Sequence, residues 1–477
     1  MQIYNSMTRR KEELKPVHEG KVGIYACGPT VYNYFHIGNA RPFITFDVLR
    51  RQLEREGYEV TFVQNFTDID DKMIRRANEE GITVKELADR FIKEYYVDAQ
   101  VLGIRPATVH PKATEHIPEI ISLITRLIEN GHAYATPGGD VYYRVSAFPG
   151  YGKLSGQSVE DREMGASERL DVETEKEAPA DFALWKAQKP GEPAWESPWG
   201  MGRPGWHVEC SAMSMKYLGE TFDIHCGGKD LLFPHHENEI AQSEGATGKP
   251  YVHYWMHNGF INVDNQKMSK SLNNFFTVRD ISKEYDLEAV RLFMLSAHYR
   301  SPINFSREQI AAANASLNRL YTARDNLAFQ QENGEDRPLN EAETAFVQRL
   351  QEYEKKFDAA MDDDLNTADA LGAIFELVKD ANTVIGPGCA KAAAEAALKS
   401  LRAICSVLGI LTKENDGLTD EVRAMVAERA EARKNKNWAR SDELRDAIRA
   451  AGYILEDTKQ GQKVRKDPDW GKAPEQA

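Results

Sequence analysis

The sequence has few cysteines and no long apolar run. Its 477 residues include five cysteines, at positions 27, 210, 226, 389 and 405, an odd number spread along the chain. This usage does not fit a disulfide scaffold and favours reduced thiols, some of them on a metal. The longest apolar stretch, residues 404–411, is far shorter than the roughly 18–20 residues that cross a bilayer, and the first residues show no secretory signal. We therefore expect a cytoplasmic protein with no membrane partner.

Positive charge is also scarce. The chain has 60 Lys and Arg against 74 Asp and Glu, a formal net charge of −14. A basic surface is the usual electrostatic sign of nucleic-acid binding, so this total argues against a broad phosphate-binding surface. Residues 421–477 nevertheless carry 13 Lys and Arg against 11 Asp and Glu. The acidity belongs to the first 420 residues and does not exclude an RNA held by a few local contacts at the C-terminal end.

The first ordered pattern predicts a strand, a helix and a second strand. Residues 22–27 form a short apolar run, apolar residues recur at helical spacing from Gly38 to Gly57, and a second apolar run covers residues 60–63. This order is typical of a parallel sheet with a crossover helix. The fold class of this end is therefore α/β.

Two changes, one in amino-acid composition and one in apolar spacing, divide the rest of the chain. Residues 150–205 are rich in Gly, Pro, Glu and Asp, which indicates a connective segment rather than core, within an insertion at about 115–205. From Ser306 onward the apolar spacing is helical. We predict a parallel-sheet domain over residues 1–305, whose loop region covers about 255–305, an α-helical bundle over 306–411 and a small C-terminal module over 418–477.

The segment His36-Ile37-Gly38-Asn39 stands where the first predicted helix begins. A helix N-terminus presents unpaired N–H groups that favour phosphate, and Gly38 allows close approach to the backbone. His36 would add a hydrogen-bond donor directed at that phosphate. An ordinary turn with a surface histidine is the alternative.

A second segment, Lys267-Met268-Ser269-Lys270-Ser271, lies in a polar, Asn-rich stretch. Two lysines three residues apart on a loop can close over a polyphosphate and neutralise a leaving pyrophosphate. A solvated basic loop is the alternative. Together, in this order and spacing, the two segments resemble the paired signature of class I aminoacyl-tRNA synthetases. The resemblance implies that His36, Lys267 and Lys270 are catalytic, and that Gly38, Asn39, Met268 and Ser269 contact ATP with its Mg²⁺. Asn39 departs from the histidine that often stands there.

A third group of residues has the chemistry of a metal site. Cys27 stands just before the first signature, and Cys210 lies in Gly205-Trp206-His207-Val208-Glu209-Cys210. His235 and Glu239 follow Pro234 at i and i+4 of an expected helix, so they share a face. Two thiolates, an imidazole and a carboxylate are a ligand set of zinc. From spacing alone, buried free cysteines and a satisfied histidine are the alternative.

These same segments, with Asn65-Phe66-Thr67-Asp68-Ile69-Asp70-Asp71, resemble the bacterial cysteinyl-tRNA synthetase family over nearly the whole chain. The resemblance implies a Rossmann-like catalytic domain and one Zn²⁺ per chain on Cys27, Cys210, His235 and Glu239. It also implies that Thr67, Trp206 and His225 line the cysteine pocket and that Asp230 binds the ATP ribose. The implied partners are ATP, L-cysteine and tRNA(Cys), and we expect a monomer.

The C-terminal module contains charged and aromatic residues that can stack on unpaired bases or bond to their edges. A solvated amphipathic helix with one packed tryptophan is the alternative. The family resemblance implies that the module reads the anticodon. The positions that match the contacts are Arg433, Trp438, Asp442 and Asp457.

Two other functions fit part of this pattern. A ligase of the mycothiol type, which joins activated cysteine to an amino sugar, would keep the catalytic domain but would have no use for an anticodon reader. A non-catalytic RNA-binding relative would have no use for an intact His36, Lys267 and Lys270. We therefore predict an ATP-dependent, AMP-forming cysteine--tRNA ligase.

Overall fold

The computed structural model describes residues 1–157, 175–267, 276–413, 419–458 and 461–466. The chain forms two units. The first contains Met1–Gln309 and Met361–Asn366, and the second contains Ile310–Ala360 and Thr367–Ala477. Among the helices in the described ranges, none is long and apolar enough to span a membrane.

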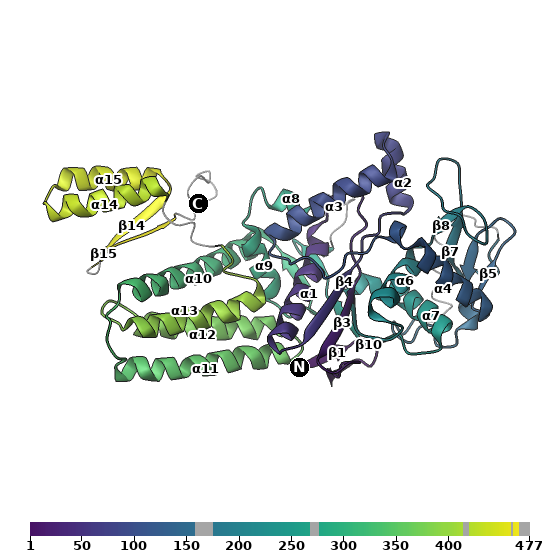
Figure 1. Cartoon of the computed structure of the whole chain (residues 1–477), viewed down its shortest axis with the longest axis horizontal. Helices are drawn as coiled ribbons and strands as arrows, with labels where there is room; N and C mark the ends of the chain where they lie inside the picture. The colour runs from purple at the N-terminus through teal and green to yellow at the C-terminus, as the bar shows by residue number, and fades with distance from the viewer. Residues whose placement is uncertain (158–174, 268–275, 414–418, 459–460, 467–477) are drawn as a thin grey trace. The chain divides into compact units, whose positions relative to one another are not determined.

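A four-stranded parallel sheet organises the first unit (Figure 1). Its strand order is β10-β9-β3-β4, and every neighbouring pair is parallel. The strands are β3 (Lys21–Ala26), β4 (Glu59–Gln64), β9 (Phe222–Gly228) and β10 (Val252–Asn258). Helix α1 (Ile37–Arg55) connects β3 to β4 and buries Phe43, Phe46, Leu49 and Leu53. The strand–helix–strand prediction for residues 22–64 is therefore confirmed.

The first unit also contains further helices and short helical turns. Helix α3 begins at a capping box in which Thr83 and Glu86 satisfy each other's backbone N–H groups. The helices are α2 (Asp71–Glu80), α3 (Val84–Val101), α6 (Trp206–Leu218), α7 (Glu237–Thr247), α8 (Val278–Ile281) and α9 (Leu287–Leu295). The short turns are η1 (Ala113–Glu115), η2 (Val145–Ala147), η3 (Lys229–Leu231) and the irregular η4 (Leu232–His236).

The insertion contains a second sheet, which corrects one expectation. Its strands pair antiparallel in the order β5-β6-β7-β8 beside α4 (Ile117–Glu129), and they are β5 (Ala133–Ala135), β6 (Val141–Tyr143), β7 (Phe182–Ala187) and β8 (Gly202–Pro204). Leu184 and Trp185 of β7 are completely buried in a core with α4 and α6. The prediction that 150–205 holds no core is therefore wrong, because short buried strands lie between its polar turns.

A small mixed sheet follows β10. It consists of β11 (Ile261–Val263), β12 (Gln266–Lys267) and β13 (Ile303–Phe305), in the order β12-β11-β13. At the N-terminus, β1 (Gln2–Asn5) pairs with β2 (Arg10–Glu13). Both small sheets belong to the first unit.

The second unit is mostly helical, as predicted from residue 306 onward. Its long helices are α10 (Arg307–Asn333), α11 (Glu341–Asp362), α12 (Thr367–Val384) and α13 (Lys391–Leu408), of which the ends of α10 and α11 belong to the first unit. Leu317, Phe346, Phe357 and Ile374 are buried, so the helical spacing identified core positions correctly. The C-terminal elements are α14 (Asp420–Lys434), α15 (Trp438–Ala450), β14 (Tyr453–Thr458) and β15 (Gly461–Lys466).

Candidate active site and metal centre

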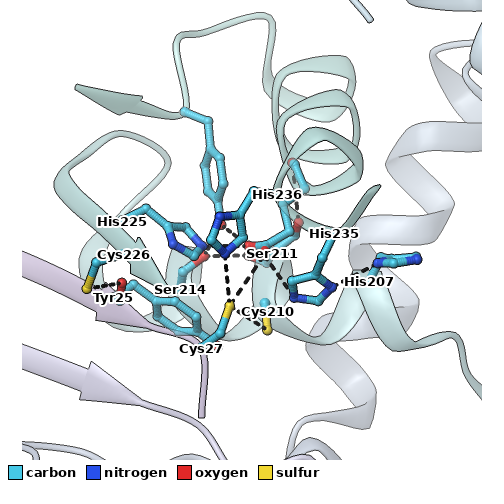
Figure 2. A network of polar contacts seen from close by, with 12 residues as sticks. Tyr25, Cys27, His207, Cys210, Ser211, Ser214, His225, Cys226, His235 and His236 are labelled. Atoms are coloured by element: carbon cyan, nitrogen blue, oxygen red, sulfur yellow. Dashed lines mark hydrogen bonds and ion pairs between the residues drawn. The ribbon is translucent and has the colours of Figure 1, made fainter. Parts of the chain in front are cut away.

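Four predicted metal ligands meet beside the carboxyl ends of β3 and β9 (Figure 2). Cys27 follows β3 and donates its backbone N–H to the carbonyl of Cys226 in β9. Cys210 comes from the first half of α6, His235 from η4 and Glu239 from the first turn of α7. Helix α7 begins at Glu237, three residues after Pro234, yet His235 and Glu239 still face each other as expected from their i, i+4 spacing.

The donor atoms of this group are close together. The Sγ atoms of Cys27 and Cys210 are 4.0 Å apart, and Oε1 of Glu239 lies 3.7 Å from the sulfur of Cys27 and 3.1 Å from Nε2 of His235. All four ligand atoms lie within 4.8 Å of one another. Two sulfurs, one imidazole nitrogen and one carboxylate oxygen in this space fit a single tetrahedral metal ion.

Glu239 is held by its other oxygen. Oε2 lies 2.8 Å from Nε2 of His225 and accepts a hydrogen bond of 3.1 Å from the hydroxyl of Tyr251. Burial acts to raise the pKa of Glu239, but His225 and His235 outweigh it and lower the pKa to about 2. The carboxylate is therefore ionised, with Oε1 left to face the metal position.

The two cysteines differ in acidity. The contact with Cys27 lowers the pKa of Cys210, whereas burial and the neighbouring Cys210 raise the pKa of Cys27. Without a metal the two sulfurs thus favour holding one proton between them. A metal ion needs thiolates, so its binding is coupled to release of that proton.

The imidazole of His235 is oriented by two aromatic neighbours. Trp206 stacks on it with ring centroids 4.6 Å apart, and Nδ1 of His207 lies 2.9 Å from Nδ1 of His235. This leaves Nε2 of His235 directed at Glu239. Trp206 is 43% exposed, so one face of this stack borders solvent.

Thr67 is linked through Asn65 to the backbone that follows Cys27. Asn65 donates from Nδ2 to Oγ1 of Thr67 at 3.3 Å, and its Oδ1 accepts the N–H of Gly28 at 2.9 Å. A Cβ on Gly28 would stand 1.6 Å from the carbonyl oxygen of Asn65, so only glycine fits there. The same amide thereby ties Thr67 to the segment that carries Cys27.

The first signature segment forms the start of α1. His36 is the N-cap residue, and Gly38 and Asn39 lie in the first turn. This segment also pairs with the residues that follow the lysine segment. His36 forms a β-bridge with Thr277, and the N–H of Ile37 donates to the carbonyl of Phe276 at 3.1 Å.

The lysine segment is described only in part. The backbone of Lys267 ends β12, paired with Asn262 of β11. Met268, Ser269 and Lys270 lie outside the described residues. Asp230 lies in η3, directly after β9.

Comparisons with known proteins identify the family of the chain. A model of the tRNA synthetases class I (C) catalytic domain matches residues 13–315, a DALR domain matches 356–412 and a cysteinyl-tRNA ligase anticodon binding domain matches 415–465. The chain is 55% identical to the cysteine--tRNA ligase of Symbiobacterium thermophilum over 98% of this chain and 99% of that protein. It is also 55% identical to that of Clostridioides difficile, over 98% and 100%.

The chain belongs to the cysteinyl-tRNA synthetase family. It is accordingly an enzyme, a class I aminoacyl-tRNA synthetase, and this confirms the family, the fold class and the enzyme class predicted from the sequence. Synthetases of this family bind ATP, an amino acid and tRNA.

Solved structures of other synthetases share the fold at low identity. Mycobacterium tuberculosis methionyl-tRNA synthetase with methionyl-adenylate is 17% identical, covers 81% of this chain and 89% of its own, and has a TM-score of 0.58. Agrobacterium radiobacter LeuRS in complex with tRNA and LeuAMS is 12% identical, covers 83% and 85%, and has a TM-score of 0.59. These likenesses concern the class I fold.

The structure contains a second possible ligand set, which the sequence analysis did not propose. Nε2 of His236 lies 3.3 Å from Sγ of Cys27, and His236, His225, Cys27 and Glu239 could also hold an ion. His236 is fully buried, and its Nδ1 lies 2.8 Å from Nε2 of His257. The set with two sulfurs is the better zinc site, because zinc favours thiolate ligands. The family resemblance already implied that His225 of β9 lines the cysteine pocket, whereas the contact of His236 of η4 with Cys27 follows from the tertiary structure.

At the C-terminal end, three of the four predicted tRNA contacts lie together. Arg433 stands over the ring of Trp438 at 5.8 Å and pairs with Asp457 at 2.9 Å. Asp442 pairs instead with Arg445 of its own helix at 3.3 Å. The sequence analysis missed Arg429, a buried arginine of α14 that bonds to both oxygens of Asp457.

Proposed function

We propose that this enzyme activates L-cysteine with ATP and transfers it to the 3′-terminal adenosine of tRNA(Cys). A carboxylate oxygen of cysteine attacks the α-phosphorus of ATP, the α–β phosphoanhydride bond breaks and pyrophosphate leaves. A ribose hydroxyl of the tRNA then attacks the carbonyl carbon of cysteinyl-adenylate and releases AMP. The observation that carries this proposal is the cluster of Cys27, Cys210, His235 and Glu239, the last three of them buried, in a chain that matches cysteine--tRNA ligases along its length.

The proposed cofactor of that cluster is one Zn²⁺ per chain. When bound, zinc would take the thiolate of the substrate directly, a contact that the hydroxyl of serine cannot match near neutral pH. A pocket that relied on size alone would separate such similar substrates by only about 1–3 kcal/mol. Glu239 is the ligand we expect to loosen when the substrate thiolate arrives.

The proposed cysteine pocket surrounds this cluster. Trp206 forms one wall by its stack on His235, and His225 supports Glu239 from the opposite side. Thr67, whose hydroxyl is bonded to Asn65, would contact the amino or carboxylate group of cysteine. These three residues are buried or half-exposed beside the thiol position.

The proposed ATP site lies at the N-terminus of α1. His36 would stabilise charge on the reacting phosphate, with Gly38 and Asn39 offering backbone and side-chain donors. Asp230 would bind the ribose. Lys267 and Lys270, with Met268 and Ser269, would hold the pyrophosphate together with Mg²⁺.

The proposed reader of the anticodon is the module of residues 418–477, with Arg433, Trp438, Asp442 and Asp457 as contacts. The exposed ring of Trp438, 57% accessible, supports base stacking. The division into a catalytic domain of 1–305 and a bundle of 306–411 belongs to the same proposal. We also propose a cytoplasmic monomer.

One experiment separates this function from its two rivals. Cysteine-dependent ATP–pyrophosphate exchange is measured first, and charging of total tRNA is measured on the same preparation. We expect both activities. Exchange without charging would support an amino-sugar ligase, and the absence of both would support a non-catalytic relative.

A further inference from the structure

Arg41 is a buried arginine in the second turn of α1, five residues after His36. It is 1% exposed. Its Nη1 donates to the carbonyls of Gly259 at 2.8 Å and Phe260 at 3.0 Å, and its Nη2 donates to the carbonyl of His298 at 3.2 Å. Among the described residues it forms no ion pair with a carboxylate.

This arrangement is unusual within the molecule. Three arginines of the described residues are fully buried, and the other two have acidic partners: Arg291 pairs with Asp47 at 2.6 Å and Arg429 with Asp457 at 2.7 Å. A buried guanidinium without a counter-charge is costly, and burial lowers the pKa of Arg41 to about 10. A neutral side chain would avoid this cost if position 41 served packing alone.

The three carbonyls identify what Arg41 holds. Gly259 and Phe260 form the connection between β10 and β11, and His298 lies between α9 and β13. The connection is tight, since a Cβ on Gly259 would stand 2.6 Å from the carbonyl oxygen of Ser301. The guanidinium of Arg41 therefore ties the segments that precede β11 and β13 to α1.

Strand β12, which ends at the first residue of the lysine segment, pairs with β11. Asn262 of β11 pairs with Lys267, so the backbone of Lys267 lies on the strand next to β11, and β11 begins directly after the Gly259 and Phe260 carbonyls that Arg41 binds. The residues after the lysine segment are tied to α1 separately, by the His36–Thr277 bridge. Helix α1 thus anchors the chain on both sides of the lysine segment.

We propose that Arg41 is a positioning residue for adenylate formation. By holding β11, and through it β12, Arg41 keeps the backbone of Lys267 at a set distance from His36. Both signature segments can then contact the same phosphates. The inference rests on the proposed function and adds to it a residue that touches no substrate. Because a 1 Å misplacement of catalytic groups can cost about 100-fold in rate, the effect belongs in kcat rather than in cysteine binding.

The test compares R41M and R41K with the matched variant R291M in the zinc-loaded full-length enzyme. Exchange kinetics give kcat and KM for cysteine, and zinc content and thermal unfolding are measured on the same samples. We expect R41M to lose about 100-fold in kcat, with KM for cysteine and zinc content within twofold of wild type. R41K, whose single ammonium cannot bridge three carbonyls, should recover part of that loss. R291M should lower the unfolding temperature at least as much while it retains kcat within a few-fold.

Three results would overturn the proposal. They are a wild-type kcat in R41M or R41K, a loss of zinc or cysteine binding that parallels the loss of kcat, and an equal loss of kcat in R291M. If R41M does not fold, R41K decides, because it retains the charge and the length of the side chain. Absence of exchange in the wild-type enzyme would instead count against the proposed function.

Discussion

The metal cluster and the C-terminal reader are built in opposite ways. At the cluster, Cys210, His235 and Glu239 are buried, and neighbouring side chains, His225 and His207, hold Glu239 and His235 in place. At the reader, Trp438 is exposed and Arg433 is half-buried, and their supports lie in neighbouring elements of one small module. A site that binds a metal and performs chemistry needs fixed geometry, whereas a surface for unpaired bases must stay open to solvent.

The largest expected difference between the two regions comes from the variant C210S. It removes one sulfur of the proposed zinc set, so zinc content and cysteine affinity should fall together. The loss in kcat/KM should exceed about 100-fold, because even residues that only orient a metal ligand are worth about 10–100-fold. Metal analysis and exchange kinetics measure both effects.

The matched control is C226S. Cys226 is also buried, but its thiol lies 3.4 Å from the carbonyl of Tyr25, a partner that a serine hydroxyl can keep. Full zinc occupancy in C210S would contradict the ligand assignment.

The second prediction addresses the reader. W438A removes an exposed ring of the second unit, whereas the metal cluster belongs to the first unit, so cysteine activation should be unchanged. Charging should lose roughly 10–100-fold in kcat/KM for tRNA, the value of one stacked base. E443A removes an exposed side chain from the same helix, α15. It serves as the control and should leave charging intact. A matching loss of pyrophosphate exchange in W438A would show that the two regions are not separable.

A smaller effect is expected from Y251F. The hydroxyl of Tyr251 donates to Oε2 of Glu239 and also contacts Ser214 at 2.6 Å. Its loss should weaken zinc binding by about tenfold, as measured by competition with a chelator. The control is Y254F, since the hydroxyl of Tyr254 donates to the carbonyl of Glu13 instead. Equal zinc affinities in the two variants would show that Glu239 needs no support from Tyr251.

The smallest effect concerns the acid stability of the reader. Hydrogen bonds from Arg429 lower the pKa of Asp457 below its usual value of about 3.9. A carboxyl whose folded pKa is depressed stabilises the fold above its unfolded pKa, and this stability is lost as pH falls through the folded pKa. In D457N the module should lose about 1 kcal/mol at pH 6 and show a flatter acid dependence below pH 4.

Hydrogen–deuterium exchange of peptides from α14 and β14 measures this stability region by region. Peptides from the metal cluster provide the internal control, because they belong to the first unit of the chain and Asp457 to the second. An acid dependence in D457N as steep as that of the wild type would contradict the role given to the Arg429–Asp457 pair.

Much of the local structure followed from the sequence. Apolar spacing identified α1 between β3 and β4, and the i, i+4 pair His235 and Glu239 does face one centre. The spacing was less informative at β7, whose buried Leu184 and Trp185 stand among polar turns. A strand of a few residues carries too short a period to be distinguished from a loop.

The sequence by itself determined the family, the α/β class and the residue types of the candidate metal site, because these depend on local spacing and on which side chains are present. The contacts of His236 with Cys27 and of Tyr251 with Glu239 follow from the tertiary structure alone, as do the three carbonyls, distant in sequence, that Arg41 binds. The physical reason is that a parallel sheet brings the ends of strands far apart in the chain to one edge, and hydrogen bonds to backbone carbonyls leave no mark on sequence spacing.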